Sequence, residues 1–317
     1  MNGGMKAGAG VWAVHLAVLA ALAVAGLLLP AYHMTNLARI MVLAVFAMGY
    51  NLAFGYAGLL SRGHAMFFAA GMYGAGLPVW HWGWSAGPAL MGGTLAGGVL
   101  ALAVGLLALR TAGVSFMIVT LMFAQAFALS ILYFNDWTHG DEGFVLADTG
   151  RSLLGWSMAA DGPRYAVAWA LFAAGLVISV LLVRSRFGRV MVALRENEER
   201  ARMLGIDPFA AKLRVLVISG LFSGRGRGLC GAVRLCRRRF RRHPYSILPM
   251  LYVLIGGAGT VLGAGLGAGI MFYLTDFASS LTSAWLFLVG AALVVLVLFA
   301  PRGILGFVRA RLWRDLP

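Results

Sequence analysis

The chain has 317 residues, of which 61% are hydrophobic and only 12% are charged, and its formal net charge is +15. Because a soluble domain carries about 25% charged residues, this composition excludes an ordinary soluble protein and indicates one that crosses a membrane many times. The positive charge would suggest nucleic-acid binding in a soluble protein, but in a membrane protein the positive-inside rule explains most of it.

Two apolar runs open the chain. Residues 11–29 are enough to cross a bilayer. A cleaved signal peptide is the alternative interpretation, but the run is longer than the usual signal core and no clear small-x-small site follows it. A second span is predicted from Ile40 to about Phe54, beginning after Arg39, and it carries the polar Asn51 at membrane depth.

A glycine-rich stretch, residues 55–76, follows the second span and contains Ser61, Arg62 and His64. Residues 256–269 form a second stretch of this kind. Broken helices are tolerated in a membrane only against protein or a water-filled cavity, and they often mark a transport path. The alternative explanation is ordinary helix packing through small residues. The candidates for the path are Asn51, Gly55, Gly58, Ser61, His64, Gln125, Gly256, Gly257 and Gly259.

The remaining spans alternate with loops whose charges set an orientation. The segment Trp80–Trp84 (WHWGW) is typical of an aromatic belt at the membrane surface. The long hydrophilic loop 135–163 has an acidic bias, which favours the periplasm. If the loop 184–212 lies in the cytoplasm, counting back through the alternating spans places Arg110 in the cytoplasm as well. Only Arg39 then lies on the periplasmic side, where a basic residue is less expected. Further spans are predicted at 88–109, 114–134, 165–183, 270–281 and 285–299.

The loop 184–212 is the longest clearly soluble segment. Residues 195–204 lack Gly and Pro and are dense in good helix formers, and Gly205 is a natural stop before Asp207-Pro208. The sequence predicts one short amphipathic helix there, which is either part of a solvated loop or a docking surface for a soluble partner. Its candidate apolar contacts are Val190, Val192, Ala193, Met203 and Leu204.

The segment 224–243 departs from the pattern. It is dense in arginine where a membrane span is needed, and residues 213–222 alone are about half of a span. The tail beyond Pro301 is also basic, so both termini are expected in the cytoplasm. The expected fold is an all-α polytopic membrane protein with about eight to ten transmembrane helices, some of them broken by glycine.

Several stretches together resemble the permease subunits of ABC importers for branched-chain amino acids, of the LivM type. They lie in order along most of the chain, and the most specific is the basic loop, in which Glu199, Ala201 and Gly205 fit an E-x-A-x-x-x-G core. Arg200 stands where that motif often has Ala. The matching stretches are GYAGLLSRGHAMFFAAGMYGAG, THGDEGF, SRFGRVMVALRENEERARMLGIDPFAAKL, IGGAGTVLGAGLGA and FAPRGILG.

The resemblance implies a single transmembrane permease domain, 1–317, in the bacterial inner membrane, with a periplasmic loop at 135–163 and a cytoplasmic coupling loop at 184–212. The residues it assigns to coupling are Arg195, Glu196, Asn197, Glu198, Glu199, Ala201 and Gly205. The implied partners are a second permease subunit, two ATP-binding cassette subunits, a periplasmic solute-binding protein and membrane lipid. Family members have a continuous apolar helix at 224–243, so we hypothesise a local frameshift or a sequencing error there, restored by about Pro244. The alternative is a basic cytoplasmic loop.

The sequence favours a transport subunit without catalytic activity of its own. It has no G-x-x-x-x-G-K-[ST], so ATP is expected to bind the partner subunits and no cofactor is expected in this chain. It also lacks HExxH, GxSxG and Cys/His metal spacing, so neither a metal site nor an intramembrane enzyme is predicted, and no nucleic acid is expected as a partner. The alternatives are import of urea, amides or aromatic acids by the same machine, or a passive channel for small polar solutes.

Overall fold

The computed structural model describes residues 2–140, 152–153, 156–157, 160–232, 244–282, 284, 287–291, 294, 298 and 303–311. Within these residues the chain is almost entirely helical, apart from a two-stranded antiparallel ladder of β1 (Ser152–Leu153) and β2 (Trp156–Ser157). Five described helices are long and apolar enough to cross a membrane. The expectation of an all-α polytopic membrane protein is therefore confirmed.

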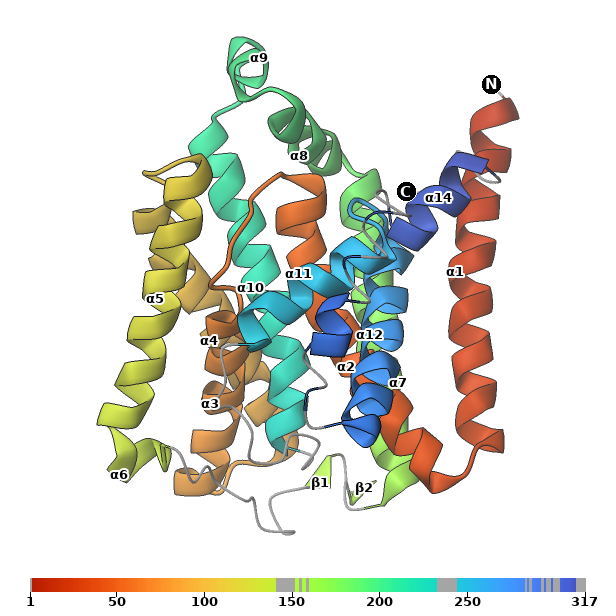
Figure 1. Ribbon diagram of the computed structural model, residues 1–317, viewed down its shortest axis with the longest axis vertical. Coiled ribbons are helices and arrows are strands. Elements are labelled where there is room, and N and C mark those ends of the chain that lie inside the picture. Colours follow the sequence, from red (N-terminus) through yellow and green to blue (C-terminus); the bar gives the residue numbers. More distant parts are fainter. Residues whose placement is uncertain are drawn as a thin grey trace.

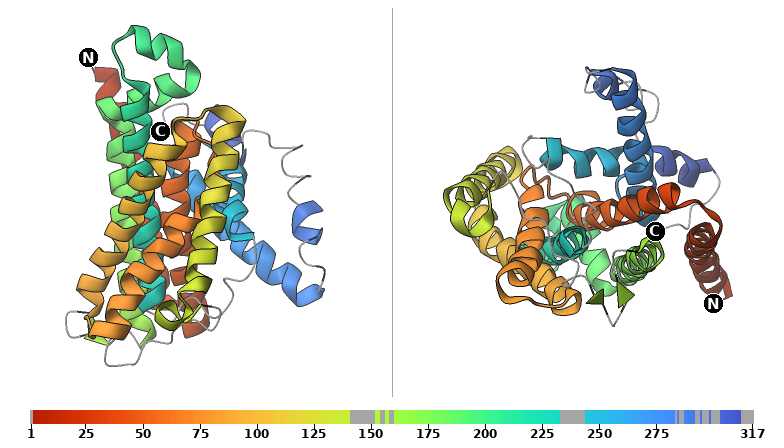
Figure 2. Two further views of the ribbon diagram at one scale, coloured as in Figure 1. Left: turned by 90° about the vertical axis from the view of Figure 1, so that its left-hand side faces the viewer. Right: turned by 90° about the horizontal axis from the view of Figure 1, so that it is seen from below.

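The long helices run side by side along the longest axis of the molecule, and two short helices project beyond one end (Figures 1 and 2). The long helices are α1 (Asn2–Leu28), α2 (Ala31–Asn51), α3 (Ala65–Trp82), α4 (Ala86–Ala108), α5 (Gly113–Tyr133), α7 (Asp161–Arg184), α10 (Pro208–Ala232) and α12 (Val261–Leu281). The shorter elements are η1 (Leu52–Tyr56), α6 (Asn135–Thr138), α8 (Arg186–Glu196), α9 (Glu198–Met203), α11 (Pro244–Gly256) and α14 (Gly303–Arg311).

Polar contacts show which turns share an end of the bundle. At one end, Thr35 donates to Asp161 across 3.3 Å, and the ring Nε2 of His81 lies 3.1 Å from the carbonyl of Trp137. The opposite end carries α8 and α9, and the N-terminus of α1 lies there too (Figure 1). This alternation agrees with the predicted parity of the loops. The cytoplasmic placement of both termini and the number of crossings stay predictions.

The start of α2 corrects one prediction. The helix begins at Ala31 and not after Arg39, because Pro30 holds an extended conformation (φ −59°, ψ 155°) and is followed directly by helical residues. Arg39 therefore lies in the third turn of a membrane-spanning helix and is partly buried there. The Nε atom of Arg39 has no hydrogen-bond partner within the described part of the chain. A basic residue proved a poor marker of this helix end, whereas the proline set it.

Glycines bring α4 and α10 into backbone contact. A Cβ built on Gly97 would lie 2.5 Å from the carbonyl oxygen of Gly220 and 2.9 Å from the Cα of Gly224. This is the small-residue packing that lets membrane helices approach closely. Helix α10 does not stop at Phe222, as a span limited to residues 213–222 would require, but runs on to Ala232. Residues 233–243 of the predicted basic segment lie outside the described residues, so the frameshift stays a hypothesis.

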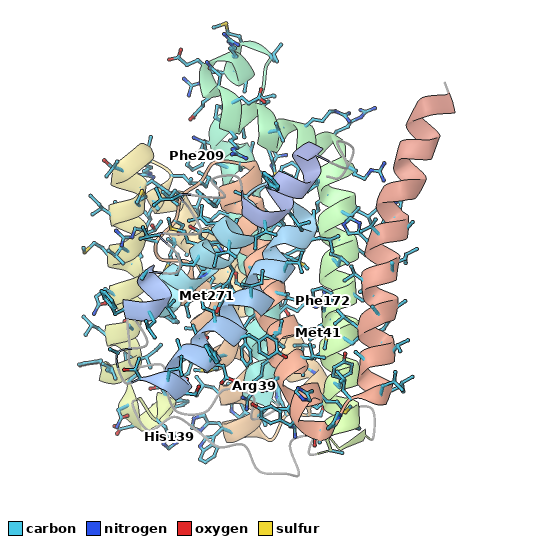
Figure 3. All side chains as sticks on the ribbon, turned by 45° about the vertical axis from the view of Figure 1, so that its right-hand side comes forward. Arg39, Met41, His139, Phe172, Phe209 and Met271 are labelled. Carbon is cyan, nitrogen blue, oxygen red and sulfur yellow. The ribbon has the colours of Figure 1, made fainter. Side chains whose placement is uncertain are left out.

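Helices α2, α7 and α12 each contribute to the main apolar core of the bundle. Met41, Phe172 and Met271, labelled in Figure 3, come from these three helices, and each is at most 5% exposed. Lipid tails are as apolar as these side chains, so the contact stabilises the bundle through close van der Waals packing and not through exclusion of water.

Replacing Gly97 with Leu is expected to separate α4 from α10, because the new side chain would meet the backbone of Gly220. We expect a loss of about 1–3 kcal/mol, as for overpacking elsewhere, seen as a lower apparent melting temperature of the detergent-purified protein. Gly162→Ala is the matched control, because a Cβ there meets nothing within 4 Å. An unchanged melting temperature for Gly97→Leu would contradict this packing.

Candidate coupling and translocation site

The first helix break follows α2. The chain passes through η1 and then leaves the helix at Gly58, whose φ of 72° is in the left-handed region. The N–H of Leu59 donates to the carbonyl of Ala53 at 2.8 Å and thereby closes the widened last turn. Residues 57–64 are not helical, and α3 begins at Ala65. Gly71, Gly74 and Gly76 lie inside α3, so the predicted break is confined to the first part of the glycine-rich stretch.

The second break lies between α11 and α12 and is shorter than predicted. It consists of residues 257–260, in which Gly257 and Gly259 have φ values of 116° and 79°. The hydroxyl of Thr260 donates to the carbonyl of Gly257 at 2.7 Å and holds the turn. Residues 263–269 already belong to α12, and the absence of a side chain on Gly256 lets α11 lie directly against its first turn.

Asn51 joins the two breaks. Its Nδ2 donates to the carbonyl of Thr260 at 2.9 Å, and its Oδ1 accepts from the N–H of Gly259 at 3.0 Å. The side chain is 2% exposed, so these bonds form away from solvent. Asn51 was predicted as a path residue, and here both ends of its amide hold backbone groups of the second break.

A buried polar cluster includes two residues of the first break, Ser61 and His64. The Nε2 of His64 lies 2.8 Å from the hydroxyl of Ser219, and Ser219 donates its one hydrogen to the carbonyl of Gly49. Ser219 therefore accepts from His64, which places the ring hydrogen on Nε2 and leaves Nδ1 as an acceptor. Within the described part of the chain, neither this Nδ1 nor the hydroxyl of Ser61 has a hydrogen-bond partner, and both residues are 0% exposed.

The other predicted path residue, Gln125, does not join this cluster. It lies on an exposed face of α5, a helix on which only Phe116 and Thr120 are buried. The structure thus gathers Asn51, Gly55 and Gly259 at one point, places Ser61 and His64 nearby in sequence, and leaves Gln125 on the outside. The role of all these residues in a solute path stays a prediction.

The loop 184–212 forms two helices, and the prediction of a single helix over 195–204 is wrong. Asn197 takes an extended conformation (φ −160°, ψ 110°) between α8 and α9. Its Oδ1 accepts from the N–H of Arg200 at 2.9 Å, which makes Asn197 the N-cap of α9. Helix capping by this side chain competes with continuation of α8, and the chain turns here.

The stop at Gly205 is confirmed in detail. The N–H of Gly205 donates to Arg202 at 3.0 Å and that of Ile206 to Ala201 at 3.2 Å, the two bonds of a Schellman cap. Gly205 has a φ of 78°, which a side chain would strain. Ala201 is 1% exposed and packs with Leu194 in a small core that also includes Val190 and Ala193.

The projecting tip of α9 leaves two large apolar side chains in the open. Met203 is 81% exposed and Leu204 is 78% exposed, so their predicted apolar contacts are absent from the described part of the molecule. Val192 is also exposed. Glu199 lies on the exposed surface of the same short helix. The tip is therefore an apolar spot bordered by charged residues.

Two side-chain polar contacts connect α8 and α9 to the bundle, beside the apolar packing of Met191 in its core. Lys212 of α10 donates to the carboxylate of Glu198 and forms an ion pair with it. The Nη1 of Arg195 donates to the carbonyl of Gly55, in the first break. Beside the ion pair lies an open cleft of about 560 Å³, whose polar lining residues include Arg110, Glu198, Arg202, Asp207 and Lys212.

The sequence of the chain matches a known protein family over most of its length. Residues 32–298 match the family model described as "Branched-chain amino acid transport system / permease component". The chain belongs to this family. It is similar to the high-affinity branched-chain amino acid transport system permease protein LivM of Salmonella typhimurium (27% identical, covering 86% of this chain and 69% of the relative) and of Escherichia coli (26%, 86% and 69%).

A further relative of this permease is a probable branched-chain amino acid transport permease protein LivM of Methanocaldococcus jannaschii. It is 32% identical over 105 residues, which cover 32% of this chain and 30% of the relative. No solved structure matches the permease.

The seven residues of the permease predicted to couple divide into three kinds. Asn197, Ala201 and Gly205 build and cap α9, so they act first on the fold of the loop. Glu196 and Glu199 are exposed, whereas Arg195 and Glu198 bind other segments of the permease. Lys212, Ser219 and Thr260 were not predicted as site residues, because their partners lie 14, 155 and 209 residues away and leave no local pattern.

Asn51→Ala is expected to destabilise this permease, because it removes the two hydrogen bonds that the Asn51 amide makes with the backbone of Gly259 and Thr260. Each of these bonds contributes about 1 kcal/mol, so the apparent melting temperature in detergent should fall clearly. Ser130→Ala is the control, since it removes a polar side chain that bonds only within its own helix. Equal melting temperatures for the two variants would argue against the Asn51 bridge.

Proposed function

We propose that this chain is a permease subunit of an ATP-driven importer that carries branched-chain or related amino acids across the bacterial inner membrane. Family membership and similarity to the LivM proteins support the transport role. The observation that carries the coupling role is the projecting pair α8–α9, with Met203 and Leu204 exposed at its tip. Exposed apolar side chains ringed by charges are typical of a protein-binding surface.

In this proposal the end bearing α8 and α9 faces the cytoplasm, and both termini lie on that side. Two ATP-binding cassette subunits dock there and bind the ATP, since the chain has no P-loop of its own. A second permease subunit completes the path, and a periplasmic solute-binding protein delivers the cargo at the opposite end. Alternating access follows when closure of the ATPase subunits moves α8 and α9.

A reversed charge at Glu199 is expected to prevent docking without disturbing the fold, because this carboxylate is exposed. Glu199→Arg should reduce the ATPase recovered with the purified permease by about tenfold or more, since a misplaced charge in an interface costs several kcal/mol. Asp136→Arg in α6 is the control, because it makes the same change on an exposed carboxylate at the opposite end.

The same variants separate an importer from a passive channel. Uptake of labelled leucine into proteoliposomes should depend on ATP and stop with Glu199→Arg. A channel would stay active in that variant, and this outcome would exclude the importer. Competition by urea, short amides or aromatic acids in the same assay identifies the cargo class.

The cap of α9 gives a test based on backbone strain alone. A Cβ built on Gly205 would meet nothing within 4 Å, so a side chain there has room. The φ of 78° at Gly205 nevertheless disfavours branched side chains. Gly205→Val should uncap α9 and reduce recovery of the ATPase, whereas Gly205→Asn should retain most of it, because asparagine tolerates this conformation. Equal recovery in both variants would show that docking does not need this cap.

A further inference from the structure

Arg195 occupies an unusual position between the projecting helices and the bundle. It lies in the last turn of α8, and the residue as a whole is exposed, yet its guanidinium reaches the first helix break. There Nη1 donates to the carbonyl of Gly55. The aliphatic part of the side chain lies along Gly58, where a built Cβ would be 3.2 Å from the Cγ of Arg195.

The second break meets the same guanidinium. A Cβ built on Gly259 would lie 3.3 Å from Nη1 of Arg195 and 3.4 Å from the carbonyl oxygen of Gly55. Asn51 holds the Gly259–Thr260 backbone at this position through its two hydrogen bonds. One side chain of α8 thus lies against two breaks that are about 200 residues apart in the chain.

The chemistry of this contact suits a reversible closure. Gly55 belongs to η1, which is a single π-helical turn. A charged guanidinium donates a stronger hydrogen bond to the Gly55 carbonyl than a neutral donor would. In the part of the chain that the structure describes, Arg195 has no ion-pair partner. Its exposure lets water solvate the charge whenever the side chain withdraws, so opening does not require burying an unpaired cation.

We propose that Arg195 is a latch that holds the two glycine breaks together at the end bearing α8 and α9. Movement of α8 withdraws the guanidinium from Gly55 and lets the breaks separate, which opens the path at this end. This inference rests on the proposed function and deepens it, because it names the side chain through which docking reaches the path. Arg195 is a positioning residue and does not itself contact the cargo.

The test uses the complete importer, with its partner permease, ATPase subunits and binding protein, in proteoliposomes preloaded with labelled leucine. Arg195→Gln should leave recovery of the ATPase unchanged but raise the leak of leucine without ATP by roughly tenfold, the effect of losing one charge-assisted hydrogen bond. Uptake per ATP hydrolysed should fall accordingly. Arg195→Lys keeps a cationic donor and should leak at a rate between native and Arg195→Gln.

Arg189→Gln is the matched control, because this exposed arginine lies on the same helix. The latch is overturned if Arg195→Gln leaks no faster than native, if Arg189→Gln leaks equally, or if Arg195→Gln loses the ATPase without any change in leak. Failure of the proposed function looks different, since the native complex itself would then show no ATP-dependent uptake. Native uptake with an unchanged leak in Arg195→Gln would reject the latch alone.

Discussion

A helix that breaks inside a membrane exposes backbone N–H and C=O groups that no water is available to satisfy. This constraint governs the structure around residues 57–64 and 257–260. The amide of Asn51 satisfies one N–H and one C=O of the second break, and it does so from the last turn of α2, just before the first break begins. The two irregular segments thus lie against each other, and the Asn51 amide connects them.

Glycine serves two different purposes in this bundle. At Gly58 and Gly259 the backbone adopts a left-handed conformation that ends a helix. At Gly97 and Gly220 the backbone is helical, and the missing side chain lets α4 and α10 touch. Both uses protect the polar backbone. The left-handed glycines allow a turn to form hydrogen bonds with its own carbonyls, and the helical glycines exclude lipid from the contact between α4 and α10.

The loop that joins α7 to α10 shows how a short motif can specify a local fold. Asn197 begins α9 and Gly205 ends it, while Ala201 fits into a small core against α8. With the helix fixed in this way, Glu199 faces outward and Met203 stands free at the tip. The ion pair of Glu198 with Lys212 connects the start of α9 to α10.

The sequence by itself determined the class of this protein, because the length and apolar character of each run depend only on neighbouring residues. The spans at 88–109, 114–134 and 165–183 and the stop at Gly205 were predictable for that reason, as was the family membership suggested by the loop motif. The start of α2 at Ala31 and the division of the loop at Asn197 were not predicted. A charged residue near a span can lie before the helix or inside it, and an asparagine can continue one helix or cap the next, so the local sequence does not distinguish the two cases.

Only the tertiary structure decided what the individual path and coupling residues contact. Asn51 was singled out only as a polar residue at membrane depth, and the structure shows that its amide bonds to the backbone of the second break. Gln125 looked equivalent to it in sequence and lies on an exposed face. Arg195 was one charge among many in a basic loop until its reach to Gly55 was seen. Partners distant in the chain meet through the packing of whole helices, and no local pattern of residues records that meeting.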